Sequence, residues 1–327
     1  MPKVSVIVPC FNEEAVLPKL FERLDKAAMT WGLDYEVLCV DDGSRDGTWE
    51  LLKAQHQRNP RWHCLCFARN FGHQVAVSAG LCYATGDAVV VLDADLQDPP
   101  EELARFFEKW REGFQVVYAV RQKRKETFFK RFCYWAFYRL MARMTRFHVP
   151  LDAGDFCLMD RRVVDILNQM PERNRFVRGM RAWAGFKQIG IPYERQARAA
   201  GEPKYSFSRL VGLAWDGVSS FSSAPLHLAT YLGFSVSTLA FVGVVFTFFQ
   251  KIFAYEFAKI GLAPNPGFPT LVISVLFLGG VQLICLGILG EYVGRIYDEV
   301  KHRPLWIVRE SAGLEITPEL SKGFSNK

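Results

Sequence analysis

Hydrophobic and polar positions follow two alternating patterns over the first 120 residues. Short apolar, β-branched runs, which are typical of buried strands, are separated by segments whose apolar positions recur with helical spacing. The predicted strands are VSVIVPC (4–10), YEVLCVDD (35–42), WHCLCF (62–67), AVVVLDAD (88–95) and FQVVYAV (114–120). The predicted helices cover residues 13–30, 46–57, 73–84 and 100–112. This alternation predicts an α/β fold in which helices cover both faces of a mostly parallel sheet.

Acidic residues end several of these predicted strands. Asp42 ends the second strand, Asp93 and Asp95 end the fourth, and the first runs into an Asn-Glu-Glu sequence. Because ligands bind at the carboxyl ends of parallel strands, we expect these side chains to converge at one edge of the sheet. Asp93 and Asp95, with the amide of Gln97, suit a hard cation such as Mg²⁺ or Mn²⁺ whose other ligands are phosphate oxygens. A solvated acidic turn is the alternative interpretation.

Several other classes of site have no support in the sequence. Neither GxxxxGK[ST] nor GxGxxG occurs, which argues against a P-loop enzyme and against dinucleotide binding. The eight cysteines form no CxxC pair, so neither a zinc site nor a disulfide framework is indicated. A formal net charge of +6 is mild, and we expect no nucleic-acid partner. A paired-carboxylate hydrolase would explain the acids, but not the apolar segments that follow.

Two segments near the C-terminus, 226–249 and 268–290, contain no Asp, Glu, Lys or Arg. Each is long enough to cross a hydrocarbon layer of roughly 30 Å as a helix. A pair of buried core helices is the alternative, but core helices rarely stay free of charge for so long. The basic residues that flank the two segments are Lys204, Arg209, Arg295, Lys301, Arg303 and Arg309. The positive-inside rule therefore predicts that both flanks are cytoplasmic and that the connector, 250–267, lies outside.

These patterns predict three parts. Residues 1–225 form a cytoplasmic catalytic domain, 226–295 a transmembrane hairpin with helices at about 226–250 and 268–292, and 296–327 a cytoplasmic tail without an interpretable motif. Both termini are then cytoplasmic, at the inner membrane.

Two further segments combine basic and large apolar residues. Residues 121–147 and 204–223 are of this kind, and we expect amphipathic helices at the membrane surface over about 126–146 and 204–222. A helix that packs on the sheet and solvates its basic face is the alternative for the first segment.

Five motifs, in order, carry a resemblance to a known family: VIVPCFNEE, VDDGSRDGT, RNFGH, VVLDADLQDPP and LDAGDFCLMDRRV. They resemble glycosyltransferase family 2, and within it the polyprenyl-phosphate glycosyltransferases, which include dolichyl-phosphate mannose synthases and bacterial GtrB-type enzymes. The likeness covers about residues 3–225, and the two apolar segments match the bacterial branch. The resemblance implies a GT-A (Rossmann-like) fold, a nucleotide-sugar donor, a lipid phosphate acceptor and inversion at the anomeric carbon.

The resemblance also implies roles for donor-side residues. Asp42 would hold the base or ribose, and Asp93, Asp95 and Gln97 would serve the metal and the diphosphate. The nucleotide-sugar site would comprise Pro9, Asn12, Glu13, Asp42, Asp93 and Asp95.

On the acceptor side, Asp155 resembles the proposed catalytic base, and Arg121, Arg131 and Arg178 would meet the acceptor phosphate. The catalytic set is thus Asp155, Asp95 and Arg131. A phosphate monoester has a second pKa near 6, so it is largely dianionic at neutral pH and needs no strong base. We therefore expect Asp155 mainly to position groups, while the arginines offset phosphate–phosphate repulsion.

The sequence thus predicts transfer of one sugar from a nucleotide diphosphate, a UDP-sugar, to undecaprenyl or another polyprenyl phosphate for modification of cell-envelope glycans. Residues 179–183, GMRAW, depart from the QxxRW of processive synthases, which favours single-sugar transfer. The alternatives are a dolichyl-phosphate mannose synthase that uses GDP-mannose, and a non-catalytic membrane scaffold or translocator. The resemblance also implies a homo-oligomer, a tetramer in similar proteins, and glycines of the second apolar segment would permit close helix packing.

Overall fold

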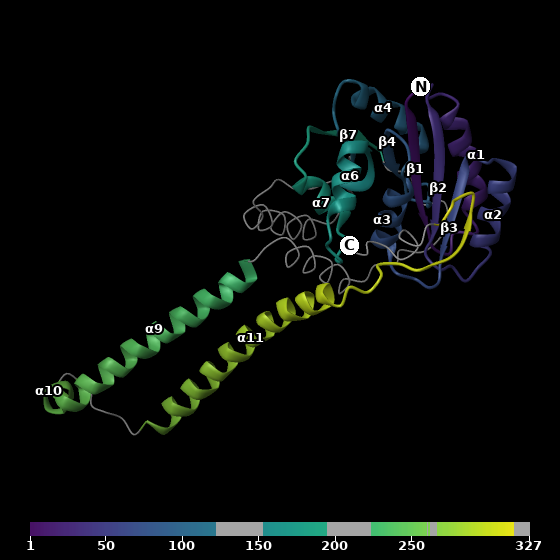
Figure 1. Cartoon of the computed structure of the whole chain (residues 1–327). Helices are drawn as coiled ribbons and strands as arrows, with labels where there is room; N and C mark the ends of the chain where they lie inside the picture. The colour runs from purple at the N-terminus through teal and green to yellow at the C-terminus, as the bar shows by residue number, and fades with distance from the viewer. Residues whose placement is uncertain (122–152, 195–223, 260, 262–266, 317–327) are drawn as a thin grey trace. The chain divides into compact units, whose positions relative to one another are not determined.

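The computed structural model describes residues 1–121, 153–194, 224–259, 261 and 267–316, and it divides into two units, Met1–Gly217 with His302–Lys327 and Val218–Lys301. The described part of the first unit is built on an eight-stranded sheet of order β7-β5-β6-β4-β1-β2-β3-β8 (Figure 1). Its strands are β1 Lys3–Cys10, β2 Asp34–Asp41, β3 Trp62–Phe67, β4 Ala88–Val91, β5 Val116–Arg121, β6 Ala153–Asp160, β7 Gln188–Tyr193 and β8 Val308–Ala312.

The direction of the strands is mixed. Strands β1 to β4 pair in parallel and so do β5 and β7, whereas β6 runs antiparallel to β4 and β5, and β8 runs antiparallel to β3. This is a GT-A-like sheet, and the predicted fold class is confirmed. The fourth strand is shorter than the predicted 88–95, because the chain leaves the sheet after Val91 and enters the acidic turn.

Helices cover both faces of the sheet. They are α1 Leu17–Ala28, α2 Thr48–Arg58, α3 His73–Tyr83, α4 Leu103–Arg111 (after the 3₁₀ turn η1 Pro100–Glu102), α6 Arg161–Gln169 and α7 Val177–Trp183. Alternate residues of β1 explain the two layers: Val6 belongs to the core under α1, α2 and α4, whereas Ile7 faces α3. A Cβ on Gly80 of α3 would lie 2.3 Å from Cγ2 of Ile7, so a glycine permits this close approach.

The segment after the second apolar helix returns to the sheet. The sequence predicts a separate tail over residues 296–327, but β8 forms the edge strand beside β3, which no motif in that segment indicates. Trp306 is 0% exposed and stacks on Phe67, with 6.4 Å between ring centroids. The indole N–H of Trp49 donates a hydrogen bond to Glu310 at 2.9 Å. The catalytic unit is therefore built from both ends of the chain.

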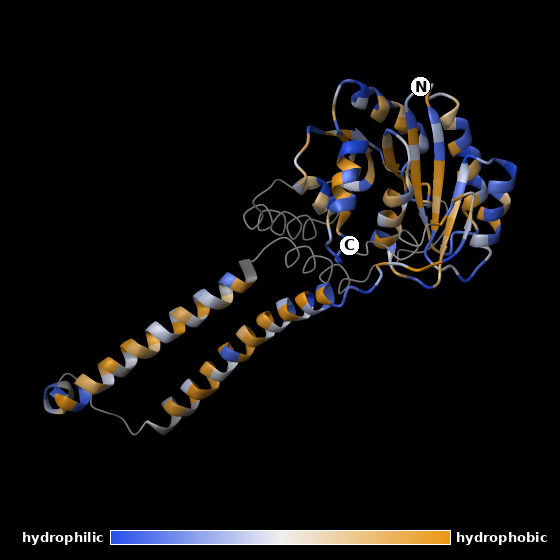
Figure 2. Cartoon of the chain, in the orientation of Figure 1, coloured by the Kyte–Doolittle hydropathy of each residue, from blue (hydrophilic) through white to orange (hydrophobic). Residues whose placement is uncertain are grey.

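The second unit contains the apolar helices α9 Ala224–Ile252 and α11 Phe268–Val300, with the short α10 Ala254–Lys259 between them. Apolar residues run along α9 and α11 (Figure 2). By length and composition, 229–252 and 273–300 are each able to cross a membrane, and the most apolar stretch of each has no buried residue. That exposure argues against core helices of a soluble protein and favours membrane association. The predicted interfacial helices, 126–146 and 204–222, lie outside the described residues.

Candidate active site

The strand ends converge as the sequence predicts, and β6 joins them from the opposite direction. The N–H of Asp42, just after β2, donates to the carbonyl of Cys10 at the end of β1, at 2.9 Å. In the antiparallel β4–β6 ladder, Val91 pairs with Cys157. Continuing that register by two residues sets Asp93 opposite Asp155, so the start of β6 supplies a carboxylate to the carboxyl edge of the parallel strands.

His73, the first residue of α3, lies between these two carboxylates. Its Nε2 is 3.7 Å from Oδ1 of Asp93 and 3.7 Å from Oδ2 of Asp155. Partial burial acts to lower the pKa of His73, whose side chain is 43% exposed, but the carboxylates of Asp155 and Asp93 outweigh it and raise the pKa to about 9. The two carboxylates therefore favour the protonated form of the imidazole. We assigned it no role from the sequence, although it ends the RNFGH motif; the contact depends on the register of β6, which the sequence does not reveal.

Asp155 is held by side chains from two helices. Nη2 of Arg178, on α7, lies 3.4 Å from Oδ1, and the amide of Gln74, on α3, donates to Oδ2 at 3.3 Å. Burial would raise the pKa of Asp155, but the charges of Arg178 and His73 outweigh it and hold the pKa below its usual value. Two residues predicted to serve the acceptor, Asp155 and Arg178, are thus brought into contact.

Asp93 has the character of a cation ligand. Its Oδ1 is buried and has no hydrogen-bond partner among the described residues. Burial, together with the charges of Asp155, Asp98 and Asp95, raises its pKa to about 6 against the opposing effect of His73. A buried carboxylate oxygen without a hydrogen-bond donor is costly unless a cation meets it, and here His73 lies 3.7 Å from this oxygen, so a metal ion would share Asp93 with His73.

Asp95 follows Asp93 in a turn of unusual backbone geometry. The N–H of Gln97 donates to Oδ1 of Asp95 at 3.1 Å, and Leu96 between them has φ +56°, which a leucine rarely adopts. Across the described ranges, no three His, Cys, Asp or Glu side chains are grouped to hold a metal. Asp93 and Asp95 offer the one or two carboxylates that Mg²⁺ takes from a protein when substrate phosphates supply other ligands.

Asp42 binds the backbone of the loop that begins α3. Its two oxygens accept hydrogen bonds from the N–H groups of Phe71, at 2.6 Å, and Gly72, at 2.9 Å. Gly43 has φ +69°, and a Cβ there would lie 2.5 Å from the carbonyl carbon of Arg69, so only glycine permits this approach. The resemblance assigned Asp42 to the base or ribose; in the structure it fixes the loop that presents His73.

The remaining donor-side residues lie around the end of β1. Pro9 pairs with Val40 inside the sheet. Asn12 has φ +55°, and its side-chain oxygen accepts the N–H of Arg45 at 2.9 Å. The N–H of Glu13 donates to the Thr48 hydroxyl at 2.9 Å. The loops after β1 and β2 are therefore joined.

Two other arginines, Arg121 and Arg131, are predicted to bind the acceptor phosphate, and the structure describes only the first of them. Arg121 is the last residue of β5, paired with Tyr193 of β7. Arg131 lies outside the described residues.

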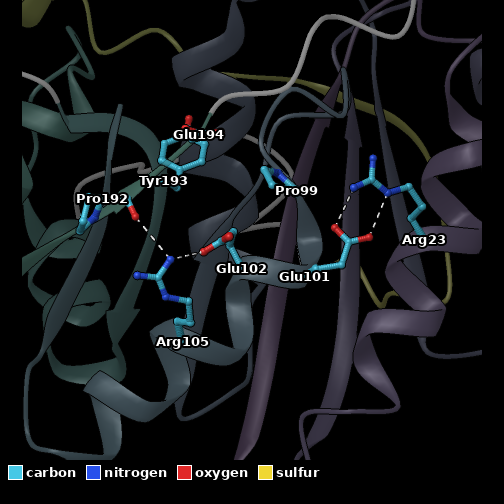
Figure 3. Close-up of a pocket in the computed structure, with 8 residues that line it drawn as sticks. All are labelled: Arg23, Pro99, Glu101, Glu102, Arg105, Pro192, Tyr193 and Glu194. Atoms are coloured by element: carbon cyan, nitrogen blue, oxygen red, sulfur yellow. Dashed lines mark hydrogen bonds and ion pairs between the residues drawn. The ribbon is translucent and has the colours of Figure 1, made fainter. Parts of the chain in front are cut away.

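A polar cleft of about 610 Å³ lies apart from these residues, between α1, η1, α4 and the end of β7 (Figure 3). Its charged groups are paired: Arg23 contacts Glu101 at 2.7 Å, and Arg105 contacts Glu102 at 2.7 Å. None of the predicted site residues lines it. The converging carboxylates, not this cleft, form the candidate active site.

Comparison with known proteins shows the family of this chain. Residues 5–167 match the family model "Glycosyl transferase family 2". The chain is 45% identical to the uncharacterized glycosyltransferase YkcC of Bacillus subtilis over 312 residues, covering 95% of this chain and 94% of that protein. It is 39% identical to the SfII prophage-derived bactoprenol glucosyl transferase of Shigella flexneri, covering 94% and 98%.

Among solved structures, the mannosyltransferase PcManGT from Pyrobaculum calidifontis, in complex with GDP-Man and Mn²⁺, matches with a TM-score of 0.47 at 17% identity, covering 91% of this chain and 88% of that chain. The sequence relatives are much closer, and they include proteins from the polyprenyl-phosphate branch that the motifs resemble. The chain is a glycosyltransferase and belongs to glycosyl transferase family 2.

Proposed function

We propose that this protein transfers one sugar, with inversion, from a UDP-sugar to undecaprenyl or another polyprenyl phosphate at the cytoplasmic face of the membrane, for modification of cell-envelope glycans. The observation that carries the proposal is the meeting of Asp93, His73, Asp155 and Arg178 at one sheet edge of a chain with two exposed apolar helices. Relatives named bactoprenol glucosyl transferase support a polyprenyl phosphate acceptor.

Each side of the site has its own chemistry. Asp93 and Asp95, with Gln97, would hold Mg²⁺ or Mn²⁺, which when bound neutralises charge on the departing diphosphate. An oxygen of the acceptor phosphate attacks the anomeric carbon from the opposite face, and the bond from that carbon to the diphosphate breaks. Because the phosphate is already ionised, no proton has to leave it, and Asp155 orients His73 and Arg178 rather than acting as a base.

Arginines make the approach of two anionic substrates feasible. Arg178, with Arg121 and Arg131, would receive the acceptor phosphate, because a guanidinium matches phosphate oxygens with parallel hydrogen bonds and stays charged. The basic residues that flank the apolar helices support a topology in which the catalytic unit and both termini are cytoplasmic. That placement lets a cytosolic sugar nucleotide meet a lipid phosphate without extraction of the lipid.

A screen of nucleotide sugars with short polyprenyl phosphates, read by mass spectrometry, tests the proposal. We expect the acceptor to gain the mass of one sugar, only when Mg²⁺ or Mn²⁺ is present, with release of the nucleoside diphosphate. Metal-dependent nucleotide binding without transfer to any polyprenyl phosphate would favour a non-catalytic protein. Repeated addition of sugars would contradict single transfer.

A further inference from the structure

Helix α7 carries two arginines one turn apart, Arg178 and Arg181, which therefore lie on the same side of the helix. Arg178 contacts Asp155 at 3.4 Å. Arg181 is only 2% exposed and lies over the ring of Tyr118 on β5, 5.6 Å from its centroid. Helix α7 packs on β6, the strand that carries Asp155, and the positive charge of Arg181 acts to lower the pKa of that carboxyl.

These two arginines have buried donors that nothing in the described part of the chain accepts. Nε of Arg178, and both Nε and Nη2 of Arg181, are buried and have no hydrogen-bond partner there. Leaving a buried charged donor unpaired is among the more expensive defects that a folded protein carries. Three such donors, from two residues on the same side of α7, indicate a site for an anion with several oxygens.

Another buried arginine shows what a purely structural role looks like here. Arg175 is 3% exposed, and its guanidinium donates to the Ser78 hydroxyl at 3.2 Å and to the carbonyls of Met170, at 2.7 Å, and Leu167, at 2.9 Å. It thereby ties α6 to α3. Arg181 is buried to the same extent as Arg175, but two of its guanidinium nitrogens have no hydrogen-bond partner among the described residues. Burial alone therefore does not explain its unpaired donors.

We infer that Arg178 and Arg181 form a phosphate-binding pair on α7, with Arg181 as its second, buried member, and that the pair receives the phosphate of the lipid acceptor. The inference rests on the proposed function and extends it to a residue that the sequence analysis left without a role. Two guanidinium forks offer the parallel N–H groups that a phosphate monoester takes up.

The donor's diphosphate has the same chemistry, and its proposed ligands Asp93 and Asp95 follow β4, next to β6, but Arg181 lies further along the sheet. Arg181 packs on Tyr118 of β5, the strand that ends in Arg121, whereas the donor-side loops follow β1 and β2. In the sheet order, β6 and β4 separate β5 from β1.

The test compares Arg181→Met and Arg181→Lys with Arg175→Lys in the full-length protein in detergent. We measure the KM for farnesyl phosphate, the Kd of UDP with Mn²⁺, and thermal unfolding with and without farnesyl phosphate. Arg181→Met should raise the KM at least tenfold, leave the UDP Kd within twofold, and abolish the stabilisation by farnesyl phosphate. Arg181→Lys keeps the charge but not the fork, and should fall between Arg181→Met and wild type.

Thermal stability distinguishes a phosphate-binding role for Arg181 from a structural role such as that of Arg175. Without ligand, Arg181→Met should unfold at or above the wild-type temperature, because it removes unpaired buried donors, whereas Arg175→Lys should unfold earlier and keep the wild-type KM. A wild-type KM and normal ligand stabilisation in Arg181→Met would overturn the inference. A weakened UDP Kd with an unchanged KM would overturn the acceptor assignment in favour of the donor.

The binding measurement also keeps this inference distinct from the proposed function. If the wild type transferred no sugar to any polyprenyl phosphate, the proposed function would fail. Stabilisation of the wild type, but not of Arg181→Met, by farnesyl phosphate or by inorganic phosphate would still support the pair. If neither farnesyl phosphate nor inorganic phosphate stabilised the wild type, the inference that the two arginines bind phosphate would be rejected.

Discussion

Asp155 has the position of a catalytic base but the surroundings of a poor one. Arg178 and His73 both stabilise its ionised form, and its pKa lies below the ordinary carboxyl value. A base works best when its pKa lies near the working pH, so this carboxylate has little tendency to take a proton at neutrality. Its contacts with His73 of α3 and Arg178 of α7 instead fit the proposed role of orienting these two side chains.

Replacement of Asp155 by Asn should therefore reduce kcat by no more than about tenfold, whereas loss of a true general base typically costs about 10²–10⁴. The measurement is steady-state transfer to farnesyl phosphate at saturating donor, with the Kd of UDP as the control for an intact donor site. The role of Arg131 is predicted from the resemblance alone. Arg131→Ala should reduce transfer more than Asp155→Asn does, because it weakens binding of the acceptor phosphate. An inactive Asp155→Asn protein that still binds UDP normally would show that Asp155 is the base.

Strand β2 contributes a buried acid that serves the fold rather than the site. Glu36 is 4% exposed, and its carboxylate contacts Nζ of Lys3 at 2.6 Å and accepts hydrogen bonds from Ser5 and from the N–H of Thr85, the latter at 2.8 Å. Burial opposes ionisation, but these partners outweigh it and lower the pKa of Glu36. The carboxylate thus joins β1, β2 and the turn before β4.

Because the folded pKa of Glu36 is lowered, its contribution to stability is present above the unfolded value of about 4.3 and is lost as the pH falls through the folded value. Glu36→Gln should lower the free energy of unfolding by about 1–3 kcal/mol near pH 7. The difference in the free energy of unfolding between Glu36→Gln and the wild type should decrease as the pH is lowered from 6 to 3. Thermal unfolding across that range measures it, with Glu22→Gln, at an exposed position of α1, as the unchanged control.

Trp306, just before β8, should be one of the most stabilising residues of the C-terminal segment. It is fully buried against Phe67, so Trp306→Ala should destabilise the catalytic unit by about 3–5 kcal/mol. Its neighbour Ile307 is 48% exposed, and Ile307→Ala should change stability by no more than about 0.5 kcal/mol. Equal unfolding temperatures for the two variants would mean that the burial of Trp306 against Phe67 adds nothing to stability.

Strands β1 to β3 were predictable because their apolar runs are long and bounded by turn residues. Strand β8, VRESA, was not, because it has no apolar run and depends on β3 and on Trp306, contacts that only the folded chain provides. The residues of the candidate site also differ in whether the sequence alone could predict them. Asp93 and Asp95 follow from a local pattern, whereas the roles of His73 and Arg181 depend on the antiparallel register of β6 and on the packing of α7.

In the sequence, the segment with the two apolar helices, Val218–Lys301, lies between the two pieces of the catalytic unit, Met1–Gly217 and His302–Lys327. A chain that simply ended before α9 would lose β8 and Trp306, so a defect in that fragment would not isolate the role of the membrane. A sharper variant replaces Val218–Lys301 with a flexible Gly/Ser linker and keeps both pieces.

This hairpin-replaced protein should bind UDP as tightly as the full chain, because every donor-side residue and β8 remain. It should also transfer sugar to water-soluble, short-chain acceptor at a comparable rate. Transfer to undecaprenyl phosphate in liposomes should fall at least tenfold, since the site is no longer held at the headgroups where the phosphate lies. Comparing the two acceptors in one preparation controls for misfolding. Undiminished transfer to the bilayer-embedded acceptor would mean that α9 and α11 serve something other than presentation of the lipid phosphate.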